Sequence, residues 1–156
     1  MELSDMEFSF GASDDLARLV KINVDAENIN RSADEGLLKD RIEQKRIRVV
    51  RVYREIAGLI YWSPDLMCRD GLVLIEQLTV SSEYRRLGLG SQLLRDCLDS
   101  LKEEGVRRVF VDVEANNAPS LGLCLSHGGI ICGVIQGIGN HPDELVRTII
   151  RFDLNK

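Results

Sequence analysis

The sequence predicts an α/β (α+β) fold in which about seven strands form a mixed central β-sheet flanked by about four helices. Two observations carry this prediction. Strand-like and helix-like segments follow one another in the order β α α β β β α β α β β. In the middle of the chain, a near-continuous apolar run over 72–80 passes through a glycine-containing turn into an amphipathic helix. Such a run is typical of a central strand buried on both faces.

Each element rests on a local pattern. Apolar residues at helical spacing, with Ser13 to Asp15 as N-terminal capping residues, predict a first helix. Ser32 and Glu35 form a capping box that predicts the start of a second helix at Ser32. Asn117 is a favourable N-cap for a short fourth helix that ends before Gly128. The expected strands cover 7–10, 46–52, 56–62, 72–80, 106–113, 130–135 and 145–152, and the expected helices 13–29, from 32 onward, 91–104 and 118–127.

Length and composition limit the class of protein. A chain of 156 residues is expected to form one domain, residues 1–156. The net charge of −5 argues against a general nucleic-acid binder. The polar N-terminus and the lack of a long apolar run predict no signal peptide and no membrane span. The four cysteines have no paired spacing, which predicts reduced thiols in a cytoplasmic protein.

A metal site is not expected. Cys124, His127 and Cys132 lie close in sequence, but they supply only three ligands, and Cys132 falls in an apolar strand-like run.

The turn before the third helix has the features of a phosphate site. Gly88 and Gly90 lie between a strand end and a helix start, where backbone N–H groups converge at the positive end of a helix dipole. The two glycines could instead simply permit a tight turn. Because Arg85 and Arg86 immediately precede them, we favour anion binding.

Two motifs resemble those of one family. Arg85-x-x-Gly88-x-Gly90 resembles the acyl-CoA-binding motif Gln/Arg-x-x-Gly-x-Gly/Ala of the GNAT superfamily of N-acetyltransferases. The run from Asn117 to Gly128 resembles the family's second motif, Asn-x-x-Ala-x-x-Leu-Tyr-x-x-x-Gly-Phe. The predicted element order is also that of the GNAT fold, so the resemblance covers nearly the whole chain.

The resemblance implies acetyl-CoA as co-substrate and assigns its binding residues. In this family two central strands splay apart and leave backbone groups for the cofactor. The strand end Leu78–Val80 would bind the acyl carbonyl and the pantetheine arm. The backbone N–H groups of the turn would bind the pyrophosphate. Asn117 would also contact the pantetheine arm. The side chains of Arg85 and Arg86 either reach the phosphates or form a solvated basic pair. The implied residues are Leu78, Thr79, Val80, Arg85, Arg86, Leu87, Gly88, Leu89, Gly90, Ser91, Asn117 and Ser120, the last replacing the usual Ala.

The catalytic residues are less well defined. Cys124 replaces the Tyr that often protonates the departing CoA thiolate, so it is either the acid or a packing residue, with solvent or Tyr84 supplying the proton. Glu76 is the one carboxylate inside the apolar strand, and we expect it to be the general base. An ion pair with a nearby arginine is its alternative role. His127 and His141 are weaker candidates.

The resemblance implies an acetyltransferase that moves the acetyl group of acetyl-CoA to a primary amine by direct attack in a ternary complex. The main alternative is a catalytically silent acyl-CoA-binding module. A third hypothesis, a nucleotide-binding regulator, is disfavoured because the sequence has no residue pattern for binding a base or a ribose. The acceptor, a small molecule or a peptide or protein amine, would bind at 28–31, 63–70 and 137–144. The last two segments contain acidic residues, which weakly favour a cationic amine as acceptor: Asp65, Asp70, Asp143 and Glu144. The acyl-chain preference and a homodimer are left open.

Overall fold

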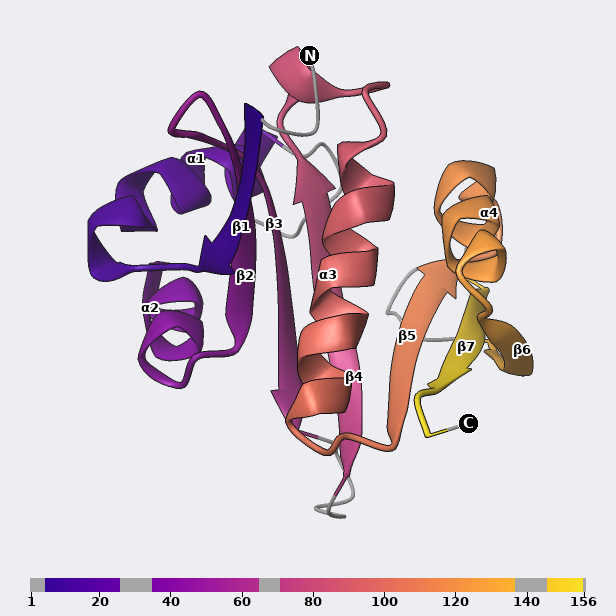
Figure 1. The fold of residues 1–156 in the computed structure, drawn as a ribbon. Helices are drawn as coiled ribbons and strands as arrows, with labels where there is room; N and C mark the ends of the chain where they lie inside the picture. The colour runs from indigo at the N-terminus through magenta and orange to yellow at the C-terminus, as the bar shows by residue number, and fades with distance from the viewer. Residues whose placement is uncertain (1–4, 26–34, 65–70, 137–145, 156) are drawn as a thin grey trace. The chain divides into compact units, whose positions relative to one another are not determined.

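The computed structural model describes residues 5–25, 35–64, 71–136 and 146–155 (Figure 1). It contains a seven-stranded sheet in the order β1-β2-β3-β4-β5-β7-β6, with four α-helices, which confirms the predicted fold class. The strands are β1 (Met6–Phe10), β2 (Ile47–Val52), β3 (Glu55–Pro64), β4 (Leu72–Val80), β5 (Arg108–Glu114), β6 (Ile130–Ile135) and β7 (Arg147–Asp153). The helices are α1 (Leu16–Asp25), α2 (Glu35–Glu43), α3 (Leu89–Glu103) and α4 (Ala118–Ser126), with short 3₁₀ turns η2 (Ser13–Asp15) and η3 (Ser82–Tyr84).

The chain divides into two compact units, and each is described by itself. The first comprises Met1–Trp62 with Gln77–Cys97, and the second comprises Ser63–Glu76 with Leu98–Lys156. None of the described helices has the length and apolar character needed to cross a membrane.

In the first unit, α1 and α2 cover one face of β2 and β3 (Figure 1). The contact is apolar because each helix turns its hydrophobic stripe toward the sheet. Its buried members come from both helices and both strands: Leu19, Ile22, Leu38, Ile42, Ile47, Val49, Ile56, Leu59 and Tyr61. The inward positions expected for Leu19, Leu38, Ile42, Ile47 and Val49 are confirmed. Val24, which we expected on the apolar face of the first helix, is 52% exposed.

The opposite face of β2 faces the first half of α3. Arg48 alternates with Ile47 and Val49 along the strand, so its side chain lies on the other side of the sheet. There its guanidinium binds the carboxylate of Asp96 on α3 and lies 4.9 Å over the ring of Phe10 on β1. The first unit is thus a sheet with α1 and α2 on one face and α3 on the other.

The hairpin between β2 and β3 turns one residue earlier than expected. The expected strands 46–52 and 56–62 place the turn before Ile56, at Arg54 and Glu55, but Val52 pairs with Glu55. The two intervening residues, Tyr53 and Arg54, have φ values of 49° and 72°. Left-handed backbone at both central positions is that of a two-residue type I′ hairpin loop, so β3 begins at Glu55.

In the second unit, β4 pairs with β5 in parallel from Leu72–Arg108 to Ile75–Val111. β7 lies between β5 and β6 and is antiparallel to both. Arg147 at the start of β7 binds Asp112 on β5 at 2.8 Å, which ties the two strands together. Gly129 leads from α4 into β6, and a Cβ there would lie 2.6 Å from Ile150.

Three expectations need correction. β4 is not buried on both faces: Val73, Ile75 and Thr79 are buried, whereas the alternate residues are half-exposed. That second face carries Glu76, and a carboxylate is best left in contact with water. The third helix begins at Leu89 rather than 91, so Gly90 lies inside its first turn. β3 ends at Pro64, two residues beyond the expected strand 56–62.

The described residues include only part of the first two predicted helices. The described portion of the first helix is a 3₁₀ turn followed by α1, which reaches Asp25. Asp15 acts in capping as expected, because its carboxylate accepts a hydrogen bond from the Ala12 N–H at 2.8 Å. Ser32 and the rest of 26–34 lie outside the described residues, so the capping box stays a prediction.

Candidate functional site

The segment from β4 to α3 forms a compact turn at the end of the strand. The Ser81 N–H donates to the Ala57 carbonyl of β3 at 2.8 Å, which anchors the chain as it leaves β4. One 3₁₀ turn, Ser82–Tyr84, follows. Arg86 then adopts φ 63° and Gly88 φ 76°. The left-handed backbone at these two positions redirects the chain into α3.

The start of α3 places its first backbone N–H groups at the end of this turn. The first hydrogen bond along the helix there runs from the Gln92 N–H to the Gly88 carbonyl, at 3.2 Å. Residues Leu89, Gly90 and Ser91 precede it, in the position where helical N–H groups point outward along the axis. The side chain of Leu89 is buried and anchors the start of the helix. The space beside Gly88 is open, because a Cβ added there would have no atom within 4 Å. This geometry suits an anion.

The arginines beside the turn are both exposed. The Nε–H of Arg85 donates to the Val80 carbonyl at 3.3 Å, so this guanidinium folds back over the end of β4. The contact occupies one of the carbonyls that the family resemblance assigns to the cofactor.

The end of β4 is held by polar contacts of its own. The Gln77 side-chain amide donates to the Thr79 hydroxyl at 2.7 Å, and Thr79 is buried. Leu78 and Val80 alternate with Thr79 and are half-exposed, as is Glu76. The shared face of Glu76 and Leu78 stays a prediction.

Gly58 is a residue that our sequence analysis missed. A Cβ at this position of β3 would lie 2.9 Å from the Thr79 carbonyl oxygen and 3.3 Å from Val50. Only glycine allows β3 to approach the C-terminal end of β4 this closely. A glycine inside an otherwise apolar strand was the available sequence signal.

In the second unit, Asn117 caps α4 as predicted. Its side-chain oxygen accepts a hydrogen bond from the Ser120 backbone N–H at 3.2 Å. Asn117 itself is exposed, and Ser120 is half-buried. The carboxamide oxygen is thus used in capping, and the NH₂ group is the part of Asn117 that suits a ligand carbonyl.

Cys124 is buried on the inner side of α4, with 6% of its surface exposed. Burial raises the pKa of its thiol to about 11, because the charged thiolate would lose its hydration. The carbonyl oxygen of Cys124 would lie 2.7 Å from a Cβ at Gly129. A side chain at position 129 would therefore require the neighbouring backbone to shift.

His127 is the C-cap of α4. Its Nδ1 lies 3.0 Å from the Leu123 carbonyl oxygen and 3.2 Å from the Ser126 hydroxyl. These contacts place the imidazole ring at the C-terminal cap of α4. Within the described ranges no group of three or more His, Cys, Asp or Glu side chains could hold a metal ion.

The predicted cofactor and catalytic residues fall into two sets. Leu78–Val80 and Arg85–Ser91 belong to the first unit, whereas Glu76, Asn117, Ser120 and Cys124 belong to the second. The structure defines the geometry of each set by itself. His141 and most of the expected acceptor segments lie outside the described residues, including Asp65, Asp70, Asp143 and Glu144.

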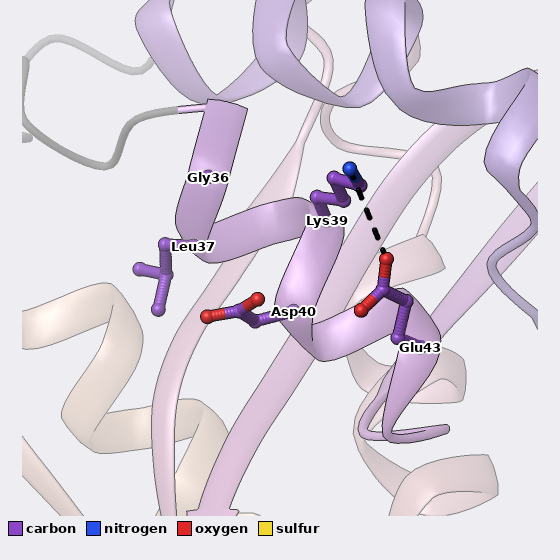
Figure 2. A pocket seen from close by; sticks show the side chains of 5 residues that line it. All are labelled: Gly36, Leu37, Lys39, Asp40 and Glu43. Atoms are coloured by element: carbon purple, nitrogen blue, oxygen red, sulfur yellow. Dashed lines mark ion pairs between the residues drawn. The ribbon is translucent and has the colours of Figure 1, made fainter.

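A hollow of about 450 Å³ lies along α2 (Figure 2). Gly36, Leu37, Lys39, Asp40 and Glu43 line it, all from this one helix. Lys39 and Glu43 face each other as an ion pair at 4.0 Å, and Asp40 points away from them (Figure 2). The hollow contains none of the predicted site residues, and we assign it no function.

The geometry of the α3 turn and the strand order can be compared with known proteins. Residues 17–128 match the sequence model described as the acetyltransferase (GNAT) family. The chain belongs to this acetyltransferase (GNAT) family. The match spans both predicted motifs, so the resemblance drawn from Arg85-x-x-Gly88-x-Gly90 is confirmed at the level of the family.

Individual relatives are more distant. A stretch of 51 residues is 37% identical to the ribosomal protein bS18-alanine N-acetyltransferase of Escherichia coli K12. This stretch covers 33% of the present chain and 34% of that protein, about a third of the curated relative's length.

Solved structures share the fold over nearly the whole chain. The ribosomal-protein-S18-alanine N-acetyltransferase from Escherichia coli has a TM-score of 0.82 at 19% identity, covering 97% of this chain and 95% of that one. The yncA structure from Salmonella typhimurium, solved with its cofactor acetyl-CoA, has a TM-score of 0.82 at 18% identity over the same shares of the two chains. At these identities the likeness is one of fold.

Proposed function

We propose that this member of the family transfers the acetyl group of acetyl-CoA to the primary amine of an acceptor. The observation that carries the proposal is the start of α3, where the left-handed backbone of Gly88 leads directly into the first turn of the helix. The pyrophosphate of CoA would bind there, since convergent N–H groups and the helix dipole both favour negative charge. The strand end Leu78–Val80 would bind the acyl and pantetheine groups, and Asn117 the pantetheine arm.

The proposed reaction is direct attack in a ternary complex. The amine nitrogen forms a bond to the thioester carbonyl carbon, and the carbon–sulfur bond of acetyl-CoA breaks to release CoA thiolate. The amine loses one proton, and the thiolate gains one. The protein contributes by holding the two substrates together and by polarising the carbonyl with backbone N–H groups.

Glu76 is the proposed acceptor of the amine proton. It lies on β4, two residues before Leu78, at a half-exposed position where a carboxylate can stay in contact with solvent. A base positioned here, directly or through one water, would serve the step that precedes or accompanies attack.

The proton for the thiolate is proposed to come from solvent or Tyr84. A thiol with a pKa of about 11 is a weak acid at neutral pH, so Cys124 is a poor donor. We therefore assign Cys124 to packing of α4. Only 6% of the surface of Cys124 is exposed, which supports this role.

We propose the N-terminal amine of a peptide or protein as the first acceptor class to test. The support is the partial sequence match to an enzyme named for an alanine of ribosomal protein bS18. Work on such an acceptor would place the chain in the cytoplasm, in keeping with Cys97, Cys124 and Cys132 as reduced thiols.

The test is acceptor-dependent release of CoA from acetyl-CoA. The panel holds peptides with free N-termini, the same peptides with blocked N-termini, polyamines, amino acids and aminoglycosides. The proposal predicts release with at least one amine, and mass spectrometry should find one added acetyl group on its nitrogen. Saturable CoA binding without transfer to any amine would favour the silent acyl-CoA-binding module, for which the replacement of Tyr by Cys124 is the supporting observation.

A further inference from the structure

Arg18 on α1 contacts the turn that leads into α3, although the two are far apart in the sequence. Its Nη2 lies 3.5 Å from the carboxylate of Glu83 in the 3₁₀ turn η3. Its Nε–H donates to the Ile56 carbonyl oxygen near the start of β3, at 3.4 Å. All three residues belong to the first unit. The guanidinium therefore joins a helix, a strand and the turn.

The backbone on each side of this ion pair is anchored by contacts of its own. Leu19, the residue after Arg18, is fully buried in the core between the helices and the sheet. On the other side, the Ser81 N–H donates to the carbonyl oxygen of Ala57, the residue after Ile56, at 2.8 Å. Ser81 immediately precedes the 3₁₀ turn. Neighbouring carbonyls of β3 thus hold both the arginine and the turn.

The negative charge of Glu83 is unfavourable at this place. Glu83 is the one acidic residue between the end of β4 and the start of α3, where we propose that the phosphates of CoA bind. A carboxylate in the same turn repels a bound anion. Arg18 supplies the opposite charge from α1 and so removes this repulsion.

The same ion pair contributes little to the stability of the fold. The side chain of Arg18 is 29% exposed and that of Glu83 is 66% exposed, and pairs in contact with solvent are weakly stabilising. Its effect on an anion at the turn should therefore be measurable in variants that remain folded.

We infer that Arg18 is a positioning residue for CoA binding, which holds and neutralises the Glu83 carboxylate so that the turn before α3 accepts phosphate. The inference rests on the proposed function and adds to it a residue outside both sequence motifs. Because Arg18 acts through Glu83, removing the charge of Glu83 should make Arg18 dispensable.

The experiment is calorimetry with CoA at low salt. Arg18→Gln should lower CoA affinity by about three- to fivefold, because the pair is exposed to solvent. The deficit should shrink as salt is added. Arg18→Lys, which keeps the charge, should retain most of the affinity. The double variant Arg18→Gln/Glu83→Gln should bind CoA as the wild type does, which a merely structural role of Arg18 does not predict.

Arg108→Gln is the matched control. Arg108 also uses its Nε–H in an exposed ion pair, with Asp153 at 3.2 Å, but it lies in the second unit and is not a predicted site residue. Its variant should keep wild-type CoA affinity. With the acceptor found in the amine screen, Arg18→Gln should raise the KM for acetyl-CoA and leave kcat unchanged.

Unchanged CoA affinity at low salt in Arg18→Gln, shown to be folded by circular dichroism, would overturn the inference. A deficit that is independent of salt, or that persists in the double variant, would also overturn it, because Arg18 would then act through the Ile56 carbonyl and not through Glu83. A wild-type chain that does not bind CoA would overturn the proposed function, and this inference with it.

Discussion

The guanidinium of Arg85 folds back onto the strand that precedes it, donating from Nε to the Val80 carbonyl oxygen at 3.3 Å. This contact links the basic pair beside the turn to the end of β4. Both partners of the contact belong to the predicted acyl-CoA site. The guanidinium also stays exposed to solvent, so its contribution to phosphate binding should be modest.

The first prediction concerns the double variant Arg85→Ala/Arg86→Ala. It should lower CoA affinity by less than about tenfold at low salt, because exposed charge pairs contribute about 1 kcal/mol or less. The deficit should shrink as salt is added. Calorimetry with CoA and with dephospho-CoA would locate the contact: a deficit seen only with CoA assigns the arginines to the 3′-phosphate. A salt-independent loss of a hundredfold would show that these side chains, and not the backbone, hold the phosphates.

The second prediction concerns Cys124→Ala. Turnover should be largely retained. The free energy of unfolding should be lower than that of the wild type by about 1 kcal/mol, as for other small changes in a core. If Cys124 were the proton donor, turnover would fall at unchanged CoA affinity, and Cys124→Tyr would restore it.

The same residue should make stability depend on pH at alkaline values. Burial raises the pKa of the Cys124 thiol to about 11, above that of an unfolded cysteine. The folded state therefore keeps its proton where the unfolded state loses it, so the free energy of unfolding should fall as pH rises from about 8.5 toward 11. Cys124→Ala should lack this component. Melting temperatures of both proteins across that range test the point, and parallel curves would contradict it.

The third prediction concerns Glu76→Gln, which keeps the shape of the side chain and removes the base. Turnover near neutral pH should fall by about a hundredfold or more, with acetyl-CoA affinity unchanged. The deficit should narrow at high pH, where more of the amine arrives deprotonated. The measurement is a pH–rate profile with the acceptor found in the amine screen.

Asp112→Asn supplies the comparison for a structural carboxylate. Asp112 is ion-paired with Arg147 at 2.8 Å, so its variant should melt at a lower temperature while turnover in the folded protein stays nearly normal. If Glu76→Gln behaves in the same way, with a normal pH–rate profile and a lower melting temperature, Glu76 has no part in proton transfer.

The sequence was most informative where one local pattern dominates. The bounds of β4 agree with the apolar run 72–80, and the Asn117 cap follows from a single favourable residue before a proline-containing helix start. Motif spacing was sufficient to place the chain in its family.

Features that depend on three-dimensional contacts were not predictable in this way. The left-handed backbone of Arg86 has no glycine to signal it. The close approach of Gly58 to Thr79, and of Gly129 to Cys124, involves residues whose separation in space no periodicity encodes. Likewise, the half-exposure of one face of β4 depends on which elements cover the strand, and the near-continuous apolar run does not reveal them.

The central claim is that the start of α3 binds the pyrophosphate of CoA, and Gly90→Val tests it most directly. A side chain there should block the approach of the phosphates. Gly36→Val is the matched control, since Gly36 and Gly90 are each the second residue of an α-helix. Calorimetry with CoA should show a loss of about a hundredfold or more for Gly90→Val, with wild-type affinity for Gly36→Val and both proteins folded by circular dichroism. Unchanged CoA affinity in folded Gly90→Val would contradict the assignment of the site.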